Sequence, residues 1–264
     1  MSESKGWAVI LGASSGFGGA TALELARSGF DIFGVHMDLR STLPNAQAVQ
    51  AGIEKEGRQA VFFNINAADE AKRIAATEEM AKKCEETGSF VRVLMHSLAF
   101  GALLPVIADT PKERLSQKQM EMTLDVMANS LIYWAQGIAA HNLFRRGSRI
   151  YAMTSSGSTR VIKSYGAVSA AKAALEAHIR QLAYELAPLG VTANSIRAGV
   201  TDTPALRRIP EGVALLERAA QFNPSGRTTT PEDVAQAIAA LSDERLHWLT
   251  GNVLGVDGGE EITV

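Results

Sequence analysis

The stretch Trp7-Ala-Val-Ile-Leu-Gly-Ala-Ser-Ser-Gly-Phe-Gly18 decides how this chain folds. Five apolar residues predict a buried strand, and glycines at positions 12, 16 and 18 follow it and open a segment with helical spacing. Glycine permits a tight turn and lets a phosphate approach bare backbone N–H groups at the positive end of a helix. The stretch therefore indicates a strand, a dinucleotide-binding turn and a helix, with an ordinary strand-to-helix turn as the alternative.

The composition is that of a globular protein with one large core. Of the 264 residues, 46% are hydrophobic and 20% are charged. The formal net charge is −2, so the chain lacks the basic excess that neutralises a phosphate backbone, and we expect no nucleic-acid partner. The single cysteine, Cys84, cannot form an intrachain disulfide, which is compatible with a reducing compartment.

The apolar residues are not arranged as a secretory signal or a membrane span. Residues 1–7 include an acid and are followed by only a short apolar run, whereas a secretory signal needs a longer one. The longest other candidate, residues 131–140, is interrupted by Gln136 and Gly137 and falls short of the ~20 apolar residues that span a bilayer. We therefore expect a cytoplasmic protein that does not bind membranes.

Short apolar segments alternate with segments of helical spacing along the chain, which predicts one doubly wound α/β domain over residues 1–264. Several strands are apolar at successive positions, as is typical of a parallel sheet covered on both faces. The predicted strands are Trp7–Leu11, Asp31–His36, Ala60–Asn64, Val91–His96, Ser148–Met153, Val191–Ile196 and Asn252–Val256. The predicted helices are Gly18–Ser28, Ala46–Glu56, Glu70–Glu86, a broken or bent Glu113–Arg145, Ala167–Leu186 and Pro231–Asp243.

Residues 203–227 have weak periodicity and contain Pro204, Pro210 and Pro224. A segment of this kind above the carboxyl edge of a sheet predicts a substrate lid, with a surface excursion as the alternative.

Further motifs follow the glycine turn in a fixed order, and together they resemble the short-chain dehydrogenase/reductase family over essentially the whole chain. They are Asn64-Ile65, Ser155, Lys172, Ala198-Gly199-x3-Thr203 and Val256-Asp257-Gly258-Gly259. The resemblance implies a Rossmann-type sheet of seven parallel strands and a nicotinamide cofactor. It also implies a homotetramer formed partly through the helices near residues 113–145 and 165–187.

The chain departs from the usual family pattern at its catalytic positions. The family's Tyr-x3-Lys pair would place a tyrosine at Val168, but the tyrosine is Tyr165, seven residues before Lys172. The usual helix asparagine falls at Met127, and the turn after the fourth strand is His96-Ser-Leu-Ala-Phe-Gly101. These departures resemble the enoyl-acyl-carrier-protein reductases, most of all the third, NADPH-dependent type.

The spacing suggests how such a site works. Positions four and seven residues apart both return to nearly the same face of a helix, so Tyr165 and Lys172 are predicted to line one cleft, with the tyrosine about one turn (~5 Å) further along the axis than the family's usual position. The resemblance implies that Tyr165 binds the enolate oxygen of the substrate. It implies that Lys172 binds the nicotinamide ribose and lowers the pKa of the phenol. Ser155 matches the family's catalytic serine, with local hydrogen bonding in a polar turn as the alternative. His96 is predicted to anchor backbone rather than to act as acid or base.

The resemblance also assigns binding residues. Three side chains at the end of the second strand and just after it bear on the choice of cofactor. Arg40 and His36 favour the 2′-phosphate of NADPH, whereas Asp38 favours the ribose hydroxyls of NADH. We expect NADPH. The cofactor contacts are Gly12, Ser14, Ser15, Gly16, Phe17, Gly18, His36, Asp38, Arg40, Asn64, Ile65, Ser97, Leu98, Ala99, Lys172, Gly199, Thr201 and Thr203. The substrate contacts are Phe100, Tyr165, Ala205 and Leu206.

The sequence thus predicts an oxidoreductase that reduces the double bond of a 2-enoyl thioester carried by acyl carrier protein or coenzyme A. A ketoreductase or alcohol dehydrogenase and an inactive nucleotide-binding sensor are the alternatives. A carrier-protein partner would need a basic patch, for which Arg207, Arg208 and Arg218 are candidates. The five histidines and the carboxylates show no metal-ligand spacing, so no metal is predicted.

Overall fold

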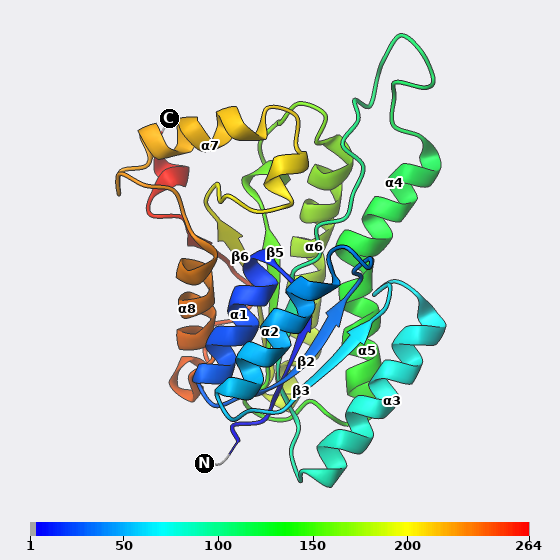
Figure 1. The fold of residues 1–264 in the computed structure, drawn as a ribbon, viewed down its shortest axis with the longest axis vertical. Helices are drawn as coiled ribbons and strands as arrows, with labels where there is room; N and C mark the ends of the chain where they lie inside the picture. Colours follow the sequence, from blue (N-terminus) through cyan, green and yellow to red (C-terminus); the bar gives the residue numbers. More distant parts are fainter. Residues whose placement is uncertain (1–3, 264) are drawn as a thin grey trace.

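A parallel sheet of seven strands runs through the middle of the structure, a computed structural model that describes residues 4–263 (Figure 1). The strands are β1 (Trp7–Leu11), β2 (Asp31–His36), β3 (Ala60–Asn64), β4 (Val91–His96), β5 (Arg149–Thr154), β6 (Thr192–Ala198) and β7 (Val253–Val256). Their order is β3-β2-β1-β4-β5-β6-β7. The order reverses between β1 and β4, which is where sheets of this kind bind ligands, beyond the carboxyl ends of the strands.

Helices cover both faces of this sheet. They are α1 (Gly16–Arg27), α2 (Leu43–Lys55), α3 (Glu70–Glu86), α4 (Gln117–Leu124), α5 (Ser130–Ala140), α6 (Gly166–Glu185), α7 (Gly212–Phe222) and α8 (Pro231–Leu241). One core lies under α1, α2 and α8, and the other lies under α3, α5 and α6. Successive residues of β1 are fully buried in alternate cores, which explains its continuous apolar run. The predicted doubly wound fold with seven parallel strands is confirmed.

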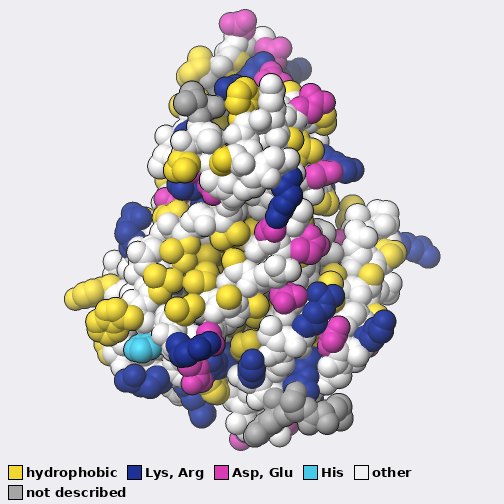
Figure 2. Space-filling model, turned by 90° about the vertical axis from the view of Figure 1, so that its left-hand side faces the viewer, with side chains coloured by type: hydrophobic (Ala, Val, Ile, Leu, Met, Phe, Trp, Pro, Cys, Tyr) yellow, Lys and Arg dark blue, Asp and Glu magenta, His cyan; other side chains and the backbone are white. Residues whose placement is uncertain are grey.

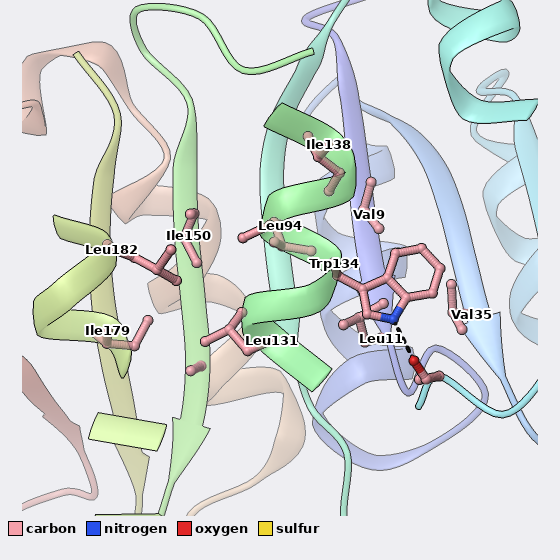
Figure 3. Close-up of a cluster of buried hydrophobic side chains, with 14 of the residues drawn as sticks. Val9, Leu11, Val35, Leu94, Leu131, Trp134, Ile138, Ile150, Ile179 and Leu182 are labelled. Atoms are coloured by element: carbon pink, nitrogen blue, oxygen red, sulfur yellow. Dashed lines mark hydrogen bonds between the residues drawn. The ribbon is translucent and has the colours of Figure 1, made fainter. Parts of the chain in front are cut away.

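Trp134 of α5 anchors the core on the α5 face (Figure 3). Its ring is fully buried near Val9, Leu11 and Val35 of the sheet, and its indole N–H donates to the carbonyl of Ala67 at 2.9 Å. A buried indole nitrogen needs such a partner, so this contact fixes the position of α5 across β1 and β4.

The long helix predicted over residues 113–145 is two helices joined by a π-helical turn, Asp125–Asn129. The first begins only at Gln117, because Ser116 accepts from the backbone N–H of Gln119 and the Gln119 side chain accepts from that of Ser116. The second ends at Ala140. The predicted break is therefore confirmed, within narrower bounds.

The segment 203–227 contains a helix that its weak periodicity did not predict. α7 lies above the carboxyl edge of the sheet (Figure 1), and Pro210 and Pro224 flank it rather than interrupt it. Ile209, just before this helix, packs against the core cluster that also contains Tyr165.

β7 is the last strand in the sheet order and forms one edge of the sheet. Figure 2 shows apolar side chains gathered on the side of the molecule where α8 lies. Exposed apolar residues near this edge include Leu246, Trp248 and Val253. Within residues 4–263, no helix is long and apolar enough to cross a membrane. Over the same residues, no cluster of three or more His, Cys, Asp or Glu side chains is placed to hold a metal ion.

Candidate active site

The glycine turn after β1 presents bare backbone to the carboxyl edge of the sheet. Gly12 and Gly16 have φ values of +95° and +53°, which other residues rarely adopt. A Cβ on Gly18 would lie 2.1 Å from the Gly12 carbonyl oxygen. Within the described residues, α1 has no side-chain cap at its N-terminus and no acidic residue in its first turn. Its first N–H groups can therefore bind a phosphate, as the sequence predicts.

The turn after β4 closes against this glycine turn. The N–H of Ser97 donates to the carbonyl of Leu11 at 2.8 Å, and a Cβ on Gly12 would lie 2.5 Å from the carbonyl oxygen of Ser97. Leu98 packs against the core, whereas Ala99 is exposed. The two turns at the reversal of strand order thus form one continuous wall of backbone, which could follow a dinucleotide.

Side chains after β2 and β3 form a small polar network beside the glycine turn. His36 Nδ1 lies 2.8 Å from Asp38 Oδ2, and Asn64 exchanges two hydrogen bonds of 3.0 Å with the backbone of Asp38. Burial raises the pKa of Asp38, but hydrogen bonds from Thr42, Ser14 and His36 outweigh it and hold the pKa below its usual value. The carboxylate of Asp38 therefore stays charged and is fixed in place next to Ser14.

Tyr165 is the residue before the first turn of α6, at φ −100° and ψ 3°, and not part of the helix. The sequence predicts that Tyr165 lies on the helix with Lys172, whereas the structure makes it the residue just before the helix, with a carbonyl that accepts from the N–H of Ser169 at 2.8 Å. The Tyr165 side chain is 9% exposed and hydrogen-bonds to Ser155. Ser155 also accepts from the N–H of Gly157 at 3.1 Å, so it serves both the local turn and the phenol.

Lys172 lies in the second turn of α6 with its ammonium group inside the protein. Its Nζ donates to the carbonyl of Met153, at the end of β5, at 2.7 Å. Burial lowers the pKa of Lys172 to about 8, against the opposing charge of Glu176. The end of β5 therefore brings the lysine and the tyrosine together, because Met153 binds one and Ser155 binds the other. We call Tyr165, Ser155 and Lys172 the Tyr165 wall.

The pKa of Tyr165 corrects a second expectation. Burial raises it above the ordinary value, and the hydrogen bond with Ser155 only partly opposes this. The predicted lowering of this pKa by Lys172 is not found, because the ammonium group is directed to the carbonyl of Met153. The phenol therefore holds its proton tightly at neutral pH, as a hydrogen-bond donor should.

Apolar side chains occupy the two positions where the family pattern has a tyrosine and an asparagine. A Cβ on Gly101 would lie 2.8 Å from Met127 Sδ and 3.0 Å from Val168 Cγ2, so Met127 and Val168 both pack against this glycine. Asn129, two residues on from Met127, instead binds His178 Nε2 at 3.1 Å. Met127 and Val168 therefore make the surface next to the Tyr165 wall apolar at the two positions where the family pattern has polar side chains.

His96 is fully buried at the end of β4, with Nε2 2.9 Å from the hydroxyl of Ser130. Burial and the charge of Lys172 lower its pKa to about 3. The imidazole is therefore neutral, and its structural role agrees with the prediction that it is not an acid or base.

The turn after β6 lies beside the glycine turn. Thr201 donates to the carbonyl of Gly199 at 2.9 Å, and a Cβ on Gly16 would lie 3.7 Å from Thr203 Cγ2. Thr203 therefore reaches the glycine turn. The sequence did not predict one contact of this turn. Both carboxylate oxygens of Glu260 accept from the N–H of Val200, at 3.2 and 3.0 Å.

Apart from Tyr165, the residues predicted to bind substrate are partly or largely exposed to solvent. Phe100 is 45% exposed in the loop between β4 and α4, and Ala205 and Leu206 are half-buried near the start of the lid segment, residues 203–227. Of the candidate docking cations, Arg207 is held by two 2.8 Å bonds to Asp202, and Arg218 lies over the ring of Phe222.

Known proteins resemble this chain over most of its length. A family model described as enoyl-(acyl carrier protein) reductase matches residues 12–261. A 1-cyclohexenylcarbonyl-CoA reductase of Streptomyces collinus is 28% identical over 96% of this chain and 86% of its own length. A 3-oxoacyl-[acyl-carrier-protein] reductase of Aggregatibacter actinomycetemcomitans is 29% identical, over 95% and 97%.

A crystal structure of a short-chain dehydrogenase from Burkholderia cenocepacia, in complex with NADP, superimposes with a TM-score of 0.81. It is 27% identical and covers 98% of this chain and 99% of its own. The relatives from Streptomyces collinus and Aggregatibacter actinomycetemcomitans are about equally similar to this chain, yet one name describes an unsaturated thioester and the other a ketone. Similarity therefore leaves the choice of substrate to the site.

Proposed function

Because the chain belongs to the short-chain dehydrogenase/reductase family, in the group that the enoyl-(acyl carrier protein) reductase model describes, we propose that it reduces 2-enoyl thioesters. The double bond of a thioester on acyl carrier protein or coenzyme A would accept a hydride, which NADPH would supply when bound. One observation carries this proposal: the only phenol of the wall is at position 165, while positions 127 and 168 hold a methionine and a valine packed on Gly101.

The position of the phenol suits an enoyl substrate. When bound, the nicotinamide supplies the hydride, which in an enoyl thioester reaches the β-carbon. The negative charge then gathers on the thioester oxygen, several bonds away, and a donor is most effective where that charge develops. Tyr165 would donate to this oxygen with Ser155 holding its hydroxyl, and Lys172 would bind the ribose hydroxyls. The apolar pair Met127 and Val168 would lie beside the alkene and donate no proton, so the proton that completes the reduction at the α-carbon would come from Tyr165 or from water.

The choice of NADPH rests on the loop after β2. Arg40 is exposed and makes no hydrogen bond or ion pair within residues 4–263, so its guanidinium is available to a 2′-phosphate. Asp38 is instead occupied by His36, Ser14 and Thr42. This preference agrees with the third type of enoyl reductase, to which we assign the chain.

A pair of substrates tests the reaction. Oxidation of NADPH and of NADH is followed by absorbance with crotonyl-CoA and, separately, with acetoacetyl-CoA. We expect turnover with the unsaturated thioester and at least about a hundredfold less with the ketone, the effect of a misplaced proton donor. Turnover of acetoacetyl-CoA alone would contradict the proposal, and binding of cofactor without turnover of either thioester would indicate a sensor.

The remaining parts of the proposal concern the lid and the assembly. We propose that residues 203–227 cover the acyl chain, which would lie against Phe100, Ala205 and Leu206. The chain would assemble as a homotetramer in the cytoplasm, and the exposed apolar residues near β7 support burial against other copies (Figure 2). Light scattering of the purified protein tests the assembly, since a monomeric mass at micromolar concentration would contradict it.

A further inference from the structure

The C-terminal turn, residues 257–262, holds together segments that are far apart in the sequence. Side chains from the end of the lid segment and from the loop between β5 and α6 bind its backbone carbonyls. These contacts are Asn223 Nδ2 to Asp257 at 2.8 Å, Ser225 Oγ to Gly258 at 2.9 Å and an Arg160 guanidinium nitrogen to Glu261 at 3.0 Å. The turn therefore touches both loops that frame the Tyr165 wall.

Glu260 carries the contact of this turn with the segment after β6. Its two carboxylate oxygens accept from the N–H of Val200 at 3.2 and 3.0 Å. A Cβ on Gly199 would lie 2.8 Å from Glu260 Oε2 and 2.4 Å from Thr229 Oγ1, so the backbone of residue 199 is pressed directly against this carboxylate. A glycine is needed at 199 because Glu260 and Thr229 fill the space beside it.

We propose that Glu260 is a positioning residue, which fixes the 199–203 turn against the nicotinamide end of the cofactor through the N–H of Val200. The inference rests on the proposed function, because Thr201 and Thr203 of this turn are assigned to cofactor binding. Without Glu260, the half-buried N–H of Val200 loses its acceptor and the turn can relax away from the sheet. A small displacement there changes the hydride-transfer geometry, to which rates are highly sensitive.

Charges around Glu260 make the contact sensitive to pH. Burial raises the pKa of Glu260; the Val200 N–H opposes this, Asp257 and Glu261 add to it, and Arg160 opposes it. Glu260 therefore takes up a proton at a higher pH than an ordinary glutamate, and its neutral carboxyl accepts more weakly from Val200. Affinity for the cofactor should then fall on the acid side of neutrality.

Three variants of the full-length protein test the proposal, with Kd for NADPH measured by fluorescence and kcat and KM measured with crotonyl-CoA. Glu260→Ala should raise both the Kd and the KM for NADPH about tenfold, the effect of one lost hydrogen bond. Glu260→Gln keeps an acceptor oxygen and should restore most of the affinity. Glu261→Ala is the matched control, because its side chain pairs with Arg160 and Arg197 rather than Val200, and should bind NADPH normally.

The outcomes separate this inference from the proposed function. If Glu260→Ala binds NADPH as tightly as the wild type, the positioning role is wrong, whatever the substrate. If the wild type binds NADPH but reduces no enoyl thioester, the proposed reaction is wrong, and the Kd comparison still tests Glu260. Should Glu260→Ala not fold, Glu260→Gln decides, because the acid-side loss of affinity in the wild type should disappear in this variant. Persistence of that loss would overturn the proposal.

Discussion

The glycine turn and the Tyr165 wall are built in opposite ways. The turn is made of backbone, with Gly12, Gly16 and Gly18 leaving N–H groups bare at the start of α1. The wall is made of side chains, and burial shifts the pKa values of Tyr165 and Lys172. A cofactor phosphate needs only space and N–H groups, whereas proton donation needs a particular atom in a particular protonation state.

This difference teaches how each region fails. A backbone site is destroyed by adding a single carbon, because the ligand and the chain have no room for it. A side-chain site is destroyed by removing a single oxygen or nitrogen, while the fold stays intact. The following substitutions and pH measurements therefore separate loss of binding from loss of chemistry.

The largest effect is expected from adding a methyl group to the turn. The Cβ in Gly18→Ala would meet the Gly12 carbonyl at 2.1 Å, which forces the backbone apart. We expect a loss of stability of about 1–3 kcal/mol and no measurable NADPH binding. Gly19→Ala is the matched control, because its Cβ would meet its nearest neighbour at an ordinary 3.4 Å. Thermal melting and a fluorescence titration compare the two; a Gly18→Ala variant with normal affinity would refute the backbone account.

The second effect is confined to chemistry. Tyr165→Phe removes the hydroxyl that hydrogen-bonds to Ser155 and leaves the ring in its buried place. We expect kcat with crotonyl-CoA to fall by a factor of about 10²–10⁴, with little change in Kd for NADPH. Tyr184→Phe, at a tyrosine that is 80% exposed, should leave kcat unchanged. Near-normal turnover of Tyr165→Phe would remove the phenol from the mechanism.

The same contrast explains which features could be predicted from the sequence. The glycine turn is local, so its residues and spacing specify its geometry, and Gly12, Gly16 and Gly18 lie as expected. The strands were also predictable, because their apolar runs are continuous and both faces of the sheet are covered.

The geometry of the wall depends on tertiary structure, and sequence spacing predicted it only in part. The first turn of α6 begins after Tyr165, following a left-handed residue at Ser164, so the tyrosine precedes the helix to which the seven-residue spacing assigns it. The carbonyl of Met153, which takes the ammonium group of Lys172, is supplied by β5. α7 was missed because Pro210 and Pro224 weaken the helical pattern, although both lie outside the helix.

A third, more gradual effect follows from the pH dependence of Lys172. Its pKa is about 8, so above pH 8 the ammonium group is lost in the folded protein, and kcat/KM should fall by up to tenfold per unit. Stability should change in the opposite direction. Between pH 8 and the ordinary lysine value of 10.5, the unfolded chain binds the extra proton, so this residue makes the free energy of unfolding rise with pH. A pH profile of kcat/KM checks the expected loss of activity, and urea melts of wild type and Lys172→Met check the expected gain in stability. A flat activity profile from pH 7 to 10 would contradict the first expectation, and a free energy of unfolding that does not rise more in the wild type than in Lys172→Met would contradict the second.

The smallest effect tests the edge of the backbone site, where a side chain does contribute. Arg40 is exposed, so a bond from its guanidinium to the 2′-phosphate is screened by water and contributes modestly. Arg40→Ala should raise the KM for NADPH about tenfold at low salt, and less at high salt, while the KM for NADH stays constant. Arg58, which lies away from this loop and binds the backbone of Gly57, provides the matched Arg58→Ala control. An equal rise with both cofactors would mean that Arg40 supports the loop rather than the phosphate, and the distinction between NADPH and NADH would then rest on Asp38 alone.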